Sequence, residues 1–112
     1  MRRFVVLEHD HPRLHWDLML EAGETLRSWR LAEPPAVDRV IAAERIGDHR
    51  RAYLDYEGPV SGGRGSVKRF DAGTFEWIED TETRVLIRLD GVKLRGTMRL
   101  EEGTAVYVTR ES

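Results

Sequence analysis

Apolar and polar residues alternate along most of the chain, in short runs separated by Gly, Asp, Glu or Pro. A period of two residues is typical of a strand with one buried face. Between residues 14 and 20 the alternation separates two sets, Leu14, Trp16, Leu18, Leu20 and His15, Asp17, Met19. Similar runs, many of them rich in β-branched or aromatic residues, predict strands at 3–9, 14–20, 25–31, 52–58, 65–73, 74–79, 84–91, 93–101 and 104–110.

One segment departs from this alternation. Residues 38–46 have a short helical pattern, and the prolines of residues 33–36 indicate a loop before it. Many short strands at regular spacing in a chain of 112 residues favour an all-β fold. We therefore expect a small antiparallel β-barrel with one short helix or irregular crossover, forming a single domain over residues 1–112.

Composition then narrows the chemistry. With 40% hydrophobic and 34% charged residues, the chain has the profile of a soluble globular protein. The net charge of −2 gives no overall basic footprint for nucleic acid, although arginines gather locally. The absence of cysteine excludes disulfides and thiolate-bound zinc, so any metal must be held by imidazole, carboxylate or water. No apolar run suits a membrane span or a signal peptide, so a cytoplasmic protein without a membrane partner is expected.

The first hairpin carries three of the four histidines, His9, His11 and His15, and Asp17 follows the last of them by two residues. Residues two apart in a strand share a face, so His15 and Asp17 project together. If the loop spans residues 10–14, His9 lies opposite His15 and projects from the same face as His15 and Asp17. A register slip of one residue would place the His9 side chain on the other face. Two imidazoles and a carboxylate on one side of an ion suit Mn, Fe or Zn. The alternative is a polar hairpin without metal, and His11, within the turn, is expected to face solvent or to lie behind the ligands.

A second dense stretch contains His49, Arg50, Arg51 and Tyr53. If it is extended, His49, Arg51 and Tyr53 share one side. Histidine can donate a proton or bind a phosphate, tyrosine can donate a hydrogen bond, and arginine can grip two phosphate oxygens. The alternative is an edge strand with solvated arginines, followed by a Gly-rich turn at residues 61–65.

Taken together, these stretches resemble the 3′-phosphoesterase domain of bacterial and archaeal DNA ligase D. The resemblance rests on four segments, in order along the chain: RFVVLEHDHPRLHWDLMLE, LRSW, DHRRAYLDYEG and FDAGTFEW. It implies a compact β-barrel with its site in a crescent-shaped groove. It also implies removal of 3′-phosphates and 3′-terminal ribonucleosides from DNA ends, stimulated by Mn²⁺ or by another divalent cation such as Zn²⁺ or Co²⁺.

The resemblance further implies site residues. The metal ligands would be His9, His15 and Asp17, and His49 and Tyr53 would be the catalytic residues at the phosphate. Arg27 stands where the family often has a lysine, and Arg51 is a further candidate for phosphate binding. One departure falls inside the site, because Met19 occupies the place of a phosphate-binding arginine and cannot donate to phosphate. Either Arg51, Arg27, Arg13 or Arg64 replaces that positive charge, or the reaction is weak, altered or absent.

Three functions follow as hypotheses. The first is a Mn²⁺-dependent phosphoesterase acting on DNA 3′ ends, at a primer–template or nicked duplex, with a ligase or polymerase acting in trans. The second is a metal-bearing module that binds DNA ends or a repair partner without catalysis, which the Met19 departure favours. The third is a metal-dependent hydrolase of a phosphoester outside nucleic acid.

Overall fold

The computed structural model describes residues 1–109, and the last residue of the final predicted strand, Arg110, lies outside the described residues. The strands are β1 (Arg2–His9), β2 (His15–Ala22), β3 (Thr25–Leu31), β4 (Val40–Arg50), β5 (Gly58–Pro59), β6 (Ser66–Asp80), β7 (Arg84–Gly91), β8 (Arg95–Glu101) and β9 (Thr104–Thr109). A single turn of 3₁₀ helix, Arg51–Leu54, follows β4. No helix in the described part of the chain is long and apolar enough to cross a membrane.

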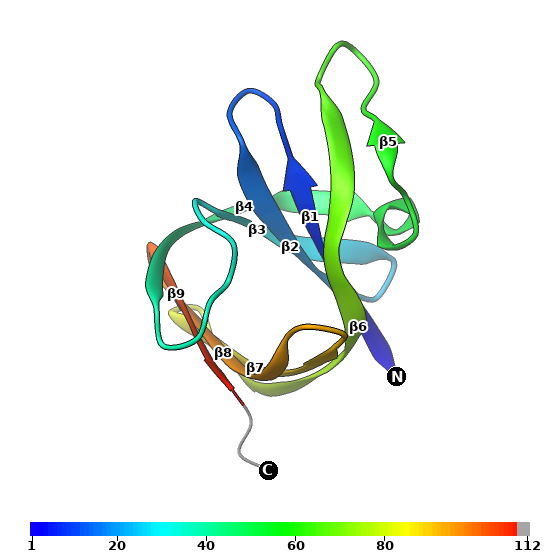
Figure 1. Ribbon diagram of the computed structural model, residues 1–112. Coiled ribbons are helices and arrows are strands. Elements are labelled where there is room, and N and C mark those ends of the chain that lie inside the picture. The colour runs from blue at the N-terminus through cyan, green and yellow to red at the C-terminus, as the bar shows by residue number, and fades with distance from the viewer. Residues whose placement is uncertain (110–112) are drawn as a thin grey trace.

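All nine strands form one antiparallel sheet in the order β1-β2-β3-β4-β9-β8-β7-β6-β5, and a further pairing of β1 with β6 closes it into a ring. Figure 1 shows this ring, with β5 and the 3₁₀ helix beside the ring near β1 and β6. The all-β antiparallel class expected from the alternation is thus confirmed. Neighbouring strands joined by short turns account for most of the pairings, which is the arrangement that alternating strands with Gly-containing turns favour.

Two apolar clusters lie on the two faces of β1 and β2. Inside the ring the main core includes Phe4, Val6, Leu18 and Leu20. The other face carries a smaller cluster, Val5, Leu7, Met19, Leu26, Leu54 and Val67. The run Phe4–Leu7 is buried throughout because the ring core covers one face and the 51–60 segment covers the other. His9 and His15, which pair next to the β1–β2 turn, project from the same face as the smaller cluster.

Two predicted elements are wrong. Residues 38–46 do not form a helix, because residues 40–50 form β4, where Ile41 and Ala43 are buried and Val40 and Ala42 are exposed. A short apolar run fits either period, and pairing with β3 and β9 decides for the strand. Residues 52–58 do not form a full strand either, because the chain turns into the 3₁₀ helix and only Gly58 pairs, at the start of β5. The strands expected at 65–73 and 74–79 are one long strand, β6, which begins at Ser66 and leaves Gly65 in the preceding loop.

Candidate metal centre

Three side chains at the turn end of the first hairpin converge on one point. His9 pairs directly with His15 in the β1–β2 register, as a loop over residues 10–14 predicts. Nδ1 of His9 is 3.4 Å from Oδ2 of Asp17, and Nε2 of His15 is 3.2 Å from Oδ1 of the same carboxylate. One ligand atom from each residue lies within 4.8 Å of the other two. Atoms about 2.0–2.2 Å from a shared ion lie at most about 4.4 Å apart, and the distances of 3.2 and 3.4 Å fall within that limit.

The outer nitrogen of each imidazole is held by a backbone carbonyl. Nδ1 of His15 is 2.8 Å from the carbonyl oxygen of Arg13, and Nε2 of His9 is 2.8 Å from that of Arg64. A carbonyl oxygen can only accept, so each of these nitrogens carries the proton and donates it. In the neutral rings, the lone pairs therefore lie on Nε2 of His15 and Nδ1 of His9, the two atoms that face Asp17. This is the usual way in which a second hydrogen bond orients a metal-binding histidine.

The Asp17 carboxylate fits a bound cation better than it fits the protein alone. Asp17 is 2% exposed, and its buried Oδ1 has no hydrogen-bond donor within the described structure. Two imidazole lone pairs and a carboxylate facing one another repel unless a positive charge lies among them. His9, His15 and Asp17 are therefore suited to hold a divalent ion, and the unshared positions around such an ion would be open to substrate.

His49 reaches the same face from β4 because of a bulge. Ser28 pairs with Ile46, but two residues back along β3 Leu26 pairs with His49, so β4 contains one extra residue around Gly47. The extra residue reverses the alternation and turns His49 to the side on which Ile46 projects. Ser28 donates its hydroxyl proton to the Leu26 carbonyl, and its Oγ lies 2.9 Å from Nδ1 of His49. Nδ1 of His49 thus donates to Ser28, which leaves Nε2 for a ligand.

The ring of Tyr53 packs edge-on against that of His49, with 5.7 Å between the ring centroids. The expectation that an extended chain aligns His49, Arg51 and Tyr53 is wrong, because Arg51–Leu54 is helical. The 3₁₀ turn nevertheless brings Tyr53 back over His49. Burial lowers the pKa of His49 below its usual value of 6.5, and the negative charge of Asp17 opposes that shift.

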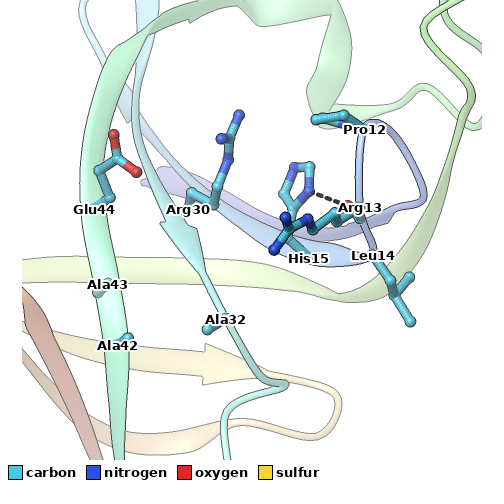
Figure 2. Close-up of a pocket in the computed structure, with 9 residues that line it drawn as sticks. All are labelled: Pro12, Arg13, Leu14, His15, Arg30, Ala32, Ala42, Ala43 and Glu44. Atoms are coloured by element: carbon cyan, nitrogen blue, oxygen red, sulfur yellow. Dashed lines mark hydrogen bonds between the residues drawn. The ribbon is translucent and has the colours of Figure 1, made fainter.

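A cavity of about 250 Å³ joins these groups. His9, Asp17, His49 and Tyr53 all line it, and Met19 forms part of its apolar wall. The exposed His11 also lines it, from the turn, but is not among the three converging ligands. His15 borders a second cavity of about 570 Å³ (Figure 2), which shares Pro12 and Arg30 with the first. The two arginines predicted at the phosphate, Arg27 and Arg51, line neither cavity.

Arg27 and Arg51 are engaged elsewhere. Arg27 projects from the opposite face of β3, donates to Asp80 over 2.9 Å, and lies 4.7 Å from the centre of the Trp77 ring. Arg51 pairs with Glu21 at 2.5 Å and donates to the Gly23 carbonyl, at the far end of β2. The structure therefore brings His9, His15, Asp17, His49 and Tyr53 together, and it leaves Arg27 and Arg51 outside the group.

Sequence reasoning did not identify Arg30. In the sheet register Arg30 lies opposite Asp17, and it lines both cavities. The signal was present in the alternation of residues 25–31, where Arg30 shares a side with Ser28. Pairing β3 with β2 in the correct register was needed to place that side against the metal ligands.

Comparison with known proteins identifies the family of the chain. A family model described as the DNA Ligase D 3′-phosphoesterase domain matches residues 7–102. The multifunctional non-homologous end joining protein LigD of Pseudomonas aeruginosa is 33% identical over 108 residues, covering 88% of this chain and 13% of the relative. The corresponding DNA repair protein LigD of Mycobacterium tuberculosis is 31% identical over 106 residues, covering 87% of this chain and 14% of the relative.

A further relative is the multifunctional non-homologous end joining protein LigD of Mycolicibacterium smegmatis, 28% identical over 116 residues. The alignment covers 88% of this chain and 15% of that relative, so the chain spans a small part of the relatives it matches. The family match extends over most of the chain, and its range contains His9, His15, Asp17, His49 and Tyr53. The chain belongs to the DNA ligase D 3′-phosphoesterase domain family.

Proposed function

We propose that this chain is a metal-dependent phosphoesterase that removes a phosphate or a ribonucleotide from DNA 3′ ends during end joining. The observation that carries the proposal is the convergence of one ligand atom each from His9, His15 and Asp17, next to the cavity that His49 and Tyr53 line. Family membership supports a phosphoester substrate, and the relatives' names support a role in non-homologous end joining.

His9, His15 and Asp17 would hold Mn²⁺ or another divalent cation, which supplies Lewis-acid polarisation of a phosphoryl oxygen. In the hydrolysis, a water oxygen forms the new bond to phosphorus, the bond from phosphorus to the leaving oxygen breaks, and that oxygen takes a proton. Nε2 of His49 is the position at which this chain can hold or transfer a proton, because Nδ1 is committed to Ser28. The hydroxyl of Tyr53 is a donor for a non-bridging oxygen.

The shape of the site also orients substrate. His49 and Tyr53 approach from the 48–54 segment, whereas the metal ligands come from the β1–β2 hairpin. A phosphate bound between these two groups would contact both of them, which orients it for in-line attack. The carbonyls of Arg13 and Arg64 hold the imidazoles in place before substrate arrives.

The test is incubation with labelled primer–templates that end in a 3′-phosphate or a single 3′-ribonucleotide, with and without Mn²⁺. We expect conversion to a 3′-hydroxyl that requires the ion and is abolished by His15→Ala or His49→Ala. Asp90→Asn, which changes an exposed carboxylate on β7, is the control for a surface substitution. Full activity of the His15→Ala variant would refute the assignment.

A second function is favoured by one observation. Met19 is 1% exposed and packs in an apolar cluster, so this part of the cavity wall offers no donor to phosphate. A module that binds DNA ends, or a repair partner, without turnover would tolerate such a wall. Tight binding of a 3′-phosphate end with no conversion under several divalent metals would favour this function over catalysis.

A further inference from the structure

We infer that Arg30 binds the substrate phosphate, from the strand next to the metal ligands. The inference rests on the proposed function and names the residue that supplies the positive charge that Met19 does not. Arg30 is on β3, where it pairs with Asp17 on β2 and with Glu44 on β4. Directly paired residues project from the same face of a sheet, so its side chain leaves the sheet beside the metal-binding carboxylate.

The position of Arg30 between two cavities supports this role. The cavity of about 250 Å³ contains His9, Asp17, His49 and Tyr53, and the one of about 570 Å³ borders His15. Only Pro12 and Arg30 line both of them, among the residues the structure describes. Figure 2 shows the guanidinium of Arg30 projecting into the same space as the His15 ring, between that ring and Glu44. A group bound at the metal would therefore have Arg30 at its side.

The guanidinium of Arg30 is free to bind a ligand. No hydrogen bond or ion pair joins it to another side chain or carbonyl in residues 1–109, although Glu44 is its neighbour in the register. An arginine presents five donors in a planar fork that matches two phosphate oxygens. An unpaired arginine beside a site that gains a divalent cation leaves an excess of positive charge, which suits an anionic ligand.

The other arginines near the site are less suited. Arg64 lines the smaller cavity, but its guanidinium donates to the carbonyl and the hydroxyl of Ser61 within its own loop. Arg13 lines only the larger cavity, and its backbone carbonyl already orients His15. Arg30 alone combines an unpaired guanidinium with a place in both cavities, within the part of the chain described.

The larger cavity continues from Arg30 away from His49. Its wall contains Leu14, Ala32, Ala42 and Ala43, which are small or apolar. The charged side chains of Arg13 and Glu44 line the same cavity. A phosphate held by Arg30 would therefore have the apolar part of this wall on one side, where the sugar and base of a terminal nucleotide can lie. Arg30 accordingly binds a phosphate attached to a nucleoside, and the 3′-phosphate of a DNA end is the probe.

The experiment measures binding of two duplexes that differ only in ending with a 3′-phosphate or a 3′-hydroxyl. Titrations are made with Mn²⁺ in a His49→Ala background, so that turnover does not consume the probe. Arg30→Ala is expected to weaken binding of the 3′-phosphate end by about 10- to 100-fold and that of the 3′-hydroxyl end by much less. Arg30→Lys should recover part of the loss, because it keeps the charge without the fork. Arg88→Ala, on an exposed part of β7, is the matched control and should not change the preference.

Mn²⁺ affinity, measured in the same variants, should be unchanged by Arg30→Ala, which separates phosphate binding from assembly of the metal site. Retention of the 3′-phosphate preference in Arg30→Ala, or absence of any preference in the parent, would overturn the inference. Absence of turnover in the unmodified chain would refute the proposed catalysis alone, because the end preference is measured without turnover.

Discussion

The carboxylate of Asp10 accepts a hydrogen bond from the backbone amide of Ser66, with 2.8 Å between Oδ1 and the nitrogen. This contact joins the β1–β2 turn to the start of β6. The carbonyl of Arg64, two residues before Ser66, holds the His9 ring. The Gly-rich loop therefore reaches the candidate metal centre through its backbone, although it contributes none of the three candidate ligands.

The contact between the β1–β2 turn and the start of β6 depends on Gly65. Its φ of +71° lies in the left-handed region, and a Cβ atom there would overlap Asp10 and approach Cβ of His11 to 2.7 Å. We expect Gly65→Ala to displace the loop, release His9 and weaken Mn²⁺ binding by about 10-fold or more. Isothermal titration calorimetry measures the affinity.

Gly63→Ala is the matched control for that prediction. Gly63 has a similar φ of +68°, but a Cβ atom there would meet nothing within 4 Å. This variant should lose about 1–2 kcal/mol of stability through backbone strain while its Mn²⁺ affinity stays near that of the unmodified chain. Equal losses of Mn²⁺ affinity in both variants would show that backbone strain, rather than the close packing of Gly65 against Asp10, determines metal binding.

Removing the charge of Asp17 should abolish the metal centre without unfolding the chain. In Asp17→Asn the two imidazole lone pairs remain, but the anionic ligand between them becomes a neutral amide. We expect Mn²⁺ affinity to fall by at least about 10-fold. The unliganded protein should be no less stable, because the buried, unsatisfied carboxylate oxygen is removed. Electron paramagnetic resonance of free Mn²⁺ and thermal denaturation with chelator measure the two effects, and unchanged affinity would contradict the ligand assignment.

Asp71 should matter for stability and not for the metal. It is 2% exposed and accepts hydrogen bonds from the backbone amides of Val92, Lys93 and Leu94, which form the turn between β7 and β8. Asp71→Asn places an NH₂ group where one of these oxygens accepts, so we expect a loss of roughly 2–3 kcal/mol in the free energy of unfolding. Urea denaturation measures it. Asp90→Asn, which changes an exposed aspartate on the neighbouring strand β7, should change stability by less than about 0.5 kcal/mol.

His49 should make the metal-free protein less stable in acid. Burial lowers its pKa in the folded state, so below the ordinary value of 6.5 the unfolded chain binds more protons than the folded one. Stability is therefore lost as the pH falls from about 6.5 to the lowered pKa, and the loss levels off below it. The difference in free energy of unfolding between the unmodified chain and His49→Gln should change over this window in the presence of chelator. His11→Gln, which removes an exposed histidine, should leave the profile in place.

Much of the site follows from the sequence because strand parity is a local property. Alternation over residues 14–20 puts His15 and Asp17 on one face, and a loop over residues 10–14 puts His9 opposite His15. Neither inference needs knowledge of the rest of the chain. The resemblance to the family then added His49 and Tyr53, which the structure places beside the same cavity.

What the sequence could not provide depends on contacts between distant strands. The segment 38–46 fits a helix by its own pattern, and only pairing with β3 and β9 makes it a strand. The bulge near Gly47 turns His49 toward the cavity that Asp17 lines. No local sequence pattern predicts an extra residue in a strand. Residues 51–54 leave the extended conformation, so Arg51 turns to Glu21 while Tyr53 packs on His49.

The sequence by itself determined that this chain alternates into antiparallel strands and that its first hairpin carries His9, His15 and Asp17, a candidate set of metal ligands, on one face. The tertiary structure alone decided which arginine side chain lies beside these residues. Arg27 and Arg30 are three residues apart on one strand, so they project from opposite faces, and the register of β3 against β2 puts Arg30 beside Asp17. Register depends on how whole strands bury their apolar faces, which is a property of the closed sheet and not of any single segment.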